Sequence, residues 1–147
     1  MRHTPEASNS PVRGLSHVAL AVHEADPVAA RFVEALGATR GAEELLDGGA
    51  LRVVFVHLGP VTLELLEPRS PEHTVARFLA THGPGFHHVS LEVEDLEATL
   101  ARVKAAGVRP IDETPRSGAH GSQVAFLHPK SLFGVLIELC RSTPPPG

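Results

Sequence analysis

The sequence predicts an α+β fold in which two β-α-β-β-β modules close around a shared cavity. Two observations indicate this fold. The chain contains one internal repeat: residues 15–22 align with residues 86–93 at an offset of 71 residues. Each copy also carries one histidine early and one glutamate late: His17 and Glu64 in the first copy, His88 and Glu138 in the second. Two copies of one small unit would bring two imidazoles and two carboxylates together across a pseudo-twofold axis.

The first module is expected at residues 14–69. Residues 15–22 alternate in side-chain size and polarity, which is typical of a strand. Asp26 as N-cap, Pro27 at the first helical position and Gly37 as terminator predict the helix that follows. Three further strands complete the unit, at residues 38–44, 51–58 and 61–66, the last two joined by a turn at Gly59 and Pro60.

The second module is expected at residues 85–141, after a linker helix at residues 70–84. Asp95 caps its helix and Gly107 ends it. Its strands are expected at residues 86–93, 108–112, 123–127 and 134–139. The two modules form one domain over residues 14–141. Residues 1–13 and 142–147 are small, polar and rich in proline, and they are expected to be disordered tails.

Composition narrows the class of protein. At 147 residues with 42% apolar side chains, the chain is long enough to fold around its own core. The formal net charge is −4 and the 13 Lys and Arg residues are scattered, which argues against a nucleic-acid partner. No apolar run is long enough to cross a bilayer, so no membrane partner is expected. Cys140 is the only cysteine, which excludes an intrachain disulfide and favours a cytoplasmic location.

The repeated histidines and glutamates predict a metal site. On the first strand His17 lies on the face opposite to Val18, Leu20 and Val22, which are expected to pack against helices. Glu64 and Glu138 each lie between aliphatic neighbours, where an unpaired carboxylate would cost several kcal/mol. Mixed imidazole and carboxylate ligands suit Co²⁺, Mn²⁺, Ni²⁺, Zn²⁺ or Fe²⁺, and Mg²⁺ is a further candidate. Any one of these residues alone would more often be structural or exposed.

Five further segments carry a resemblance to a known family. They are LELLEP at residues 63–68, GFHH at 85–88, GAHG at 118–121, FLHPKS at 126–131 and GVLIEL at 134–139. With the strand that contains His17, these segments closely resemble the methylmalonyl-CoA epimerases of the vicinal oxygen chelate superfamily. The resemblance runs from residue 15 to residue 141, and it implies a half-open barrel of paired modules around a metal.

The resemblance also implies a reaction. It implies a divalent metal ion held by His17, Glu64, His88 and Glu138, and a homodimer that acts on a CoA thioester. The implied activity interconverts (R)- and (S)-methylmalonyl-CoA by 1,1-proton transfer through a metal-stabilised enolate. Glu138 corresponds to one of the family's two acid/base groups.

The second acid/base group of the family is a glutamate on the strand at residues 51–58. The sequence alignment places Arg52 there, and an arginine cannot act as a base at ordinary pH. Glu44, in the preceding segment, is therefore the hypothesis for the second catalytic residue. Glu43, Asp47, a histidine or a water are the alternatives.

Two residues are candidates for substrate binding. His120 would line the pocket near the substrate carboxylate, and Lys130 would meet the CoA phosphates.

The leading alternative activity is that of a glyoxalase I-like lactoylglutathione lyase, or of another metalloenzyme of the superfamily. A metal-free drug-binding protein of the bleomycin-resistance type is disfavoured, because the chain has no Trp or Tyr to stack on a flat ligand.

Overall fold

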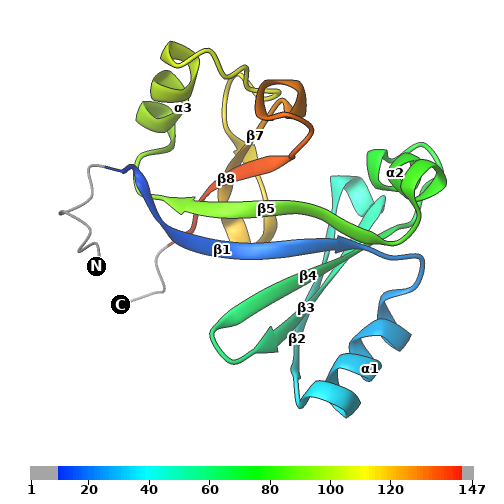
Figure 1. The fold of residues 1–147 in the computed structure, drawn as a ribbon. Coiled ribbons are helices and arrows are strands. Elements are labelled where there is room, and N and C mark those ends of the chain that lie inside the picture. The colour runs from blue at the N-terminus through cyan, green and yellow to red at the C-terminus, as the bar shows by residue number, and fades with distance from the viewer. Residues whose placement is uncertain (1–9, 144–147) are drawn as a thin grey trace, which may run out of the picture.

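The computed structural model describes residues 10–143, which form one continuous eight-stranded sheet with helices packed around it (Figure 1). The strands are β1 (Val12–Ala21), β2 (Thr39–Leu46), β3 (Leu51–Leu58), β4 (Val61–Pro68), β5 (Gly85–Val93), β6 (Arg116–Ser117), β7 (Gln123–Leu127) and β8 (Ile137–Arg141). The α-helices are α1 (Ala25–Leu36), α2 (Thr74–His82) and α3 (Leu96–Ala105). Three short 3₁₀ turns lie at Asp47–Gly49, Ala119–Gly121 and Pro129–Leu132.

The strand order confirms the two-module prediction. Across the sheet the order is β2-β3-β4-β1-β5-β8-β7-β6. The first strand of each module pairs in parallel with the last strand of the same module, β1 with β4 and β5 with β8. The two first strands pair with each other in antiparallel fashion at the centre of the sheet. The modules are thus related by a pseudo-twofold axis between β1 and β5, and the curled sheet forms a half-open barrel (Figure 1).

Alternation along the strands assigns the two faces of the sheet as predicted. Leu20 and Val22 pack with α1 and the outward side chains of β3, in one hydrophobic cluster. Ala19 and Ala21 belong to a different cluster on the opposite face, which includes Val53 and the apolar side of α2. Small residues at the centre of this inner face leave room for a cavity.

The first helix begins differently from the sequence prediction. Asp26 is not the N-cap, because the helix begins at Ala25 and Glu24 occupies the cap position without a side-chain hydrogen bond. The carboxylate of Asp26 instead pairs with the guanidinium groups of Arg40 and Arg52. The Ala25 amide donates to a carboxylate oxygen of Glu67, 2.7 Å away on β4. A side chain distant in sequence therefore satisfies the helix terminus.

The other helices follow the prediction more closely. Asp95 caps α3, since its side chain accepts the Ala98 amide at 2.9 Å. The linker helix is shorter than predicted, because His73 provides the cap of α2 and residues 70–73 form turns. The strand expected at residues 108–112 is absent from the described structure, apart from one bridge between Pro110 and Leu127. Proline has no amide hydrogen with which to continue a strand ladder.

The ends of the domain extend beyond the predicted residues 14–141. Strand β1 begins at Val12, and Ser142 donates both its amide and its hydroxyl hydrogen to the Glu92 carboxylate. The rest of the predicted tails, residues 1–9 and 144–147, lies outside the described residues. Among the described residues, no helix has the length and apolar character needed to span a membrane.

Candidate metal centre and substrate cavity

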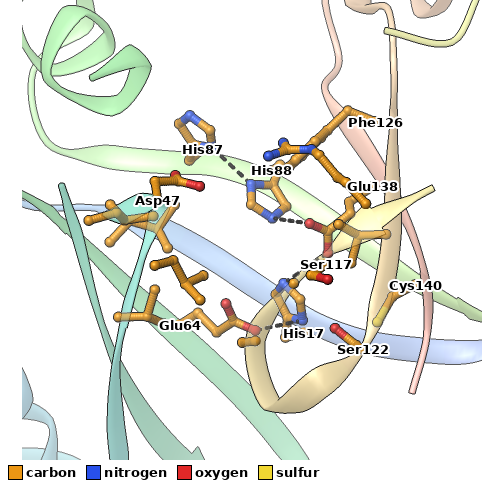
Figure 2. A pocket seen from close by; sticks show the side chains of 18 of the residues that line it. His17, Asp47, Glu64, His87, His88, Ser117, Ser122, Phe126, Glu138 and Cys140 are labelled. Carbon is orange, nitrogen blue, oxygen red and sulfur yellow. Dashed lines mark hydrogen bonds and ion pairs between the residues drawn. The ribbon is translucent and has the colours of Figure 1, made fainter. Parts of the chain in front are cut away.

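The four residues singled out by the internal repeat converge on the inner face of the sheet (Figure 2). The four central strands β4, β1, β5 and β8 contribute one each: Glu64, His17, His88 and Glu138. All four are buried, with 6–7% of their surface exposed. Because each lies within a strand at the centre of the sheet, the backbone that positions them is rigid.

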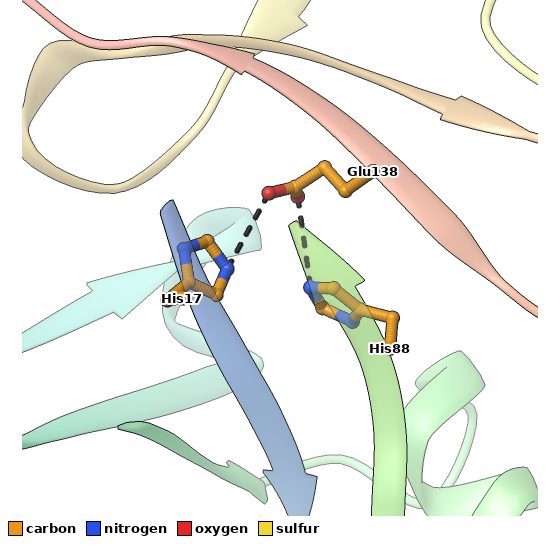
Figure 3. A group of neighbouring side chains, drawn as sticks. All are labelled: His17, His88 and Glu138. Atoms are coloured by element: carbon orange, nitrogen blue, oxygen red, sulfur yellow. Dashed lines mark ion pairs between the residues drawn. The ribbon is translucent and has the colours of Figure 1, made fainter. Parts of the chain in front are cut away.

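Three of these side chains form a group that could hold a metal ion (Figure 3). Candidate ligand atoms of His17, His88 and Glu138 all lie within 4.8 Å of one another. The Glu138 carboxylate bridges the two imidazoles, with one oxygen 3.4 Å from His17 Nε2 and the other 3.8 Å from His88 Nε2. Both Nε2 atoms are buried and have no hydrogen-bond partner among the described residues. Buried polar atoms rarely lack a partner, and a divalent cation would satisfy both.

The position of Glu64 differs from that expected in a four-ligand site. Its carboxylate lies 2.9 Å from His17 Nδ1, on the side of the ring away from Glu138, and it is not in the group of three. Glu64 thus contacts Nδ1, and Nε2 on the opposite side of the ring faces Glu138. Metal-binding histidines are commonly oriented in this way by a carboxylate on their second nitrogen. Glu64 therefore contacts the candidate ligand His17, and its own role as a fourth ligand stays a prediction.

His88 is oriented by another histidine. Its Nδ1 lies 2.8 Å from Nδ1 of His87, so one of these nitrogens donates to the other. Burial lowers the pKa of His88 to about 2, and the neighbouring rings of His87 and His17 contribute to the shift. Burial likewise lowers the pKa of His87 to about 4. Both rings are neutral near pH 7, as a metal-ligating imidazole must be.

The remaining two members of the group have pKa values raised from their ordinary range. Burial raises the pKa of Glu138, against the opposing effects of His17 and of the hydrogen bond from Ser90. Burial by itself would lower the pKa of His17, but the hydrogen bond and charge of Glu64, with the charge of Glu138, outweigh it. Ser90 is fully buried, and its hydroxyl donates to Glu138 Oε1 at 2.7 Å. The sequence analysis did not identify Ser90, although its alternation with His88 on β5 places both on one face.

The group lies in a cavity of about 660 Å³, within the usual range for small-molecule sites. The lining includes the metal-binding group, apolar side chains of β3 and β4, and the loop that begins at Gly118. Leu51 and Val53 are the β3 residues that face it. The cavity combines a candidate cation site with an apolar wall, which suits a ligand that has both polar and hydrophobic parts.

Two residues considered for catalysis, Arg52 and Glu44, lie outside the cavity lining. Arg52 does not line the cavity: its side chain extends from the opposite face of β3 and pairs with Asp26, Glu43 and Glu67. Alternation therefore presents Leu51 and Val53 to the cavity, and Arg52 is not in a position to act on a substrate there. Glu44 does not line the cavity either, and its carboxylate accepts the backbone amide of His120 at 3.0 Å. This contact gives Glu44 a role in holding the loop.

Of the two predicted substrate-binding residues, only His120 is among the described residues that line the cavity. His120 lines the cavity, and its ring packs on Phe55 with centroids 4.4 Å apart. Its backbone has the left-handed φ of 55°, so the loop is held in a strained conformation across the two modules. Lys130 is exposed in the turn after β7 and is not among the residues that line the cavity.

Comparisons with known proteins give the family. Residues 16–126 match the model of the Glyoxalase/Bleomycin resistance protein/Dioxygenase superfamily. The chain is 40% identical over 127 residues to an ethylmalonyl-CoA/methylmalonyl-CoA epimerase of Cereibacter sphaeroides, a match that covers 85% of this chain and 95% of the relative. This chain belongs to the methylmalonyl-CoA epimerase family.

Solved structures agree with this assignment. The crystal structure of methylmalonyl-CoA epimerase from Mycobacterium tuberculosis superposes with a TM-score of 0.90 at 33% identity, covering 95% of this chain and 94% of that one. A variant of the Streptomyces coelicolor methylmalonyl-CoA epimerase, in complex with 2-nitronate-propionyl-CoA, superposes with a TM-score of 0.85 at 30% identity, covering 90% and 99%. The half-open barrel is thus the fold of the epimerase family.

Proposed function

We propose that this protein is a metal-dependent epimerase that interconverts the (R) and (S) forms of methylmalonyl-CoA. The observation that carries the proposal is the pair of buried, unpartnered Nε2 atoms of His17 and His88, which face Glu138 inside the cavity of a chain from the epimerase family. The named relatives support a CoA thioester over the glutathione adduct of the alternative lyase activity.

The donor set suits a divalent cation. Two imidazoles and a carboxylate would hold it, and the candidates stay Co²⁺, Mn²⁺, Ni²⁺, Zn²⁺, Fe²⁺ and Mg²⁺. The cation would act as a Lewis acid that stabilises the negative charge developing on the thioester oxygen when the α-proton leaves. Calorimetric titration of the metal-free protein with each cation ranks the candidates, and loss of binding in His88→Ala is the control.

The two carboxylates that flank His17 fit an exchange of protons at opposite faces of one carbon. Inversion requires that one group removes the α-proton and that another group returns a proton to the other face. Glu138 lies beside Nε2 of the ring and Glu64 beside Nδ1, so the ring separates the two carboxylates. We assign Glu138 as one acid/base group and Glu64 as the first candidate for the second. Asp47, one of the alternatives named from the sequence, also lines the cavity, whereas Arg52 and Glu44 do not.

Isotope exchange in D₂O tests this assignment. Wild-type protein loaded with each divalent cation is incubated with either epimer of methylmalonyl-CoA, and NMR follows the C2 proton and the configuration. Wild type should exchange the proton of both epimers and interconvert them. Glu138→Gln and Glu64→Gln should each still exchange the proton of one epimer, a different one in each variant, while interconversion falls by roughly 10²–10⁴-fold. Glu72→Gln, which alters an exposed carboxylate at the cavity wall, is the matched control.

Each result has a distinct meaning. Undiminished interconversion by Glu64→Gln would remove Glu64 from the mechanism and leave the epimerase activity intact. If wild type exchanges no proton with any cation, the proposed function is wrong, and turnover of the methylglyoxal–glutathione adduct becomes the next assay. The homodimer and the cytoplasmic location stay predictions; light scattering coupled to size exclusion chromatography tests the first.

A further inference from the structure

Arg116 stands apart from the other residues that line the cavity. It is the only arginine or lysine in that lining, whereas four carboxylates belong to it: Asp47, Glu64, Glu72 and Glu138. A methylmalonyl thioester would bring a further negative charge into this acidic cavity. A compensating cation favours recognition of that charge. Besides the divalent cation proposed above, Arg116 is the one permanent cation that the described lining supplies.

Asp112 and Phe126 hold the guanidinium group of Arg116 in place. Its Nε lies 3.2 Å from Asp112 Oδ1, and the other oxygen of Asp112 accepts the Phe126 amide at 2.8 Å. Asp112 is thereby tied to the backbone of β7, and its side chain is only 18% exposed. The guanidinium carbon also lies 5.4 Å from the centre of the Phe126 ring, in a cation–π contact. These contacts limit the orientations that the guanidinium group can adopt.

The two terminal nitrogens of Arg116 are available. Neither has a hydrogen-bond or ion-pair partner within residues 10–143. A guanidinium group presents its donors as a planar fork, which matches the two oxygens of a carboxylate. Because Asp112 occupies Nε alone, the terminal pair remains free to bind an anion.

Only one aromatic ring separates Arg116 from the metal-binding group. The Phe126 ring that supports the guanidinium packs edge-on against His88, with centroids 4.9 Å apart and planes at 88°. An anion bound by Arg116 therefore lies near the reacting part of a substrate. The phosphates of CoA are separated from its thioester by the long pantetheine arm, so they do not fit a cation placed this close to His88.

We infer that Arg116 binds the free carboxylate of the substrate and thereby selects malonyl-type thioesters over neutral acyl thioesters. The inference rests on the proposed function and deepens it, because it assigns a specificity-determining residue to the same cavity. Arg116 was not among the residues predicted from the sequence, although His120, four residues later, was expected to line the same cavity.

Calorimetric binding of two thioesters tests the inference. Methylmalonyl-CoA and propionyl-CoA differ only by the carboxylate, and both are titrated into the protein saturated with a divalent cation. Wild type should prefer methylmalonyl-CoA. Arg116→Gln should weaken methylmalonyl-CoA binding by roughly 10- to 100-fold and change propionyl-CoA binding by less than about twofold. Arg116→Lys should give an intermediate loss, because it keeps the charge without the fork.

Matched controls separate the possible outcomes. Arg13→Gln removes an exposed arginine that pairs with Glu94 away from this cavity, and it should change neither affinity. Thermal unfolding of Arg116→Gln checks that the variant is folded. An equal loss of affinity for both thioesters would overturn the inference in favour of a contact with the CoA part, and unchanged affinities would overturn it outright. Wild-type protein that binds neither thioester would instead refute the proposed function.

Discussion

The two modules carry equivalent residues that have different surroundings. In the first module the ring of His17 is oriented by the carboxylate of Glu64. In the second module the ring of His88 is oriented by the neutral ring of His87, and Glu138 is left free to bridge both imidazoles. The repeat therefore provides a symmetric set of side chains, and their neighbours make the two halves chemically distinct.

Small differences between the two copies produce this asymmetry. Ser90 in the second module aligns with Ala19 in the first, so only Glu138 receives a hydroxyl hydrogen bond. His87 aligns with Ser16, so only His88 has an adjacent imidazole. An internal repeat can thus conserve the positions of the candidate ligands while single neighbours divide their roles.

The largest expected effect concerns the histidine ligands. His88→Ala removes one of the three candidate ligands and should abolish measurable metal binding. His87→Ala removes only the partner of that ligand and should weaken metal binding by roughly 10- to 100-fold. Calorimetric titration of both variants with the preferred cation measures the difference. Equal affinities in the two variants would contradict the assignment of His88 as the ligand.

A smaller effect is expected at Ser90. Ser90→Ala leaves one oxygen of a buried carboxylate without its hydrogen bond, which should lower the free energy of unfolding by about 1–3 kcal/mol. It should also lower kcat more than it raises KM, since Glu138 loses its orientation. Denaturant unfolding and steady-state kinetics measure the two effects. Ser70→Ala, which removes an exposed hydroxyl that donates to the Glu72 carboxylate, is the matched control, and its stability should change little.

The pH dependence of stability in the metal-free protein should have one sign for His87 and His88 and the opposite sign for His17 and Glu138. His87 and His88 have pKa values below the unfolded value of 6.5, so their neutral state favours folding at pH 7 and this contribution is lost as pH falls below about 6.5. His17 has a raised pKa, so its contribution is present below pH 6.5 and is lost as pH rises through the folded pKa.

Thermal unfolding between pH 5 and pH 8 measures this balance. We expect the two histidines of the second module to dominate, and the melting temperature to fall between pH 7 and pH 5. His87→Gln should flatten that fall, because one of the two neutral rings is removed. A melting temperature that rises steadily toward pH 5 in the wild type would show that His17 and Glu138, whose pKa values are raised, dominate instead.

The smallest effect is expected at Glu44. Glu44→Gln should change kcat and KM by less than about threefold, because the amide oxygen can still accept the His120 amide and no catalytic contact is lost. Steady-state kinetics with methylmalonyl-CoA measures this. A loss approaching that expected for Glu138→Gln would mean that Glu44 reaches the substrate after all.

Most helices and strands of the fold could be predicted from the sequence. The repeat, the alternation of strand residues and the glycine and proline signals predicted both modules and the shared inner face of His17, Glu64, His88 and Glu138. The failures have local causes. Asp26 has the character of an N-cap but pairs with Arg40 and Arg52, and the predicted strand at residues 108–112 is interrupted by Pro110.

The sequence by itself determined which four side chains share the inner face of the sheet, because strand periodicity assigns each residue to one of two faces and the repeat selects the same positions twice. Only the tertiary structure decided how those four side chains divide their roles. The contact of Glu64 with Nδ1 of His17, the outward direction of Arg52 and the placement of Arg116 all depend on cross-strand register and on loops that join distant segments. Such contacts have no periodic signal in the chain, so only the folded structure reveals them.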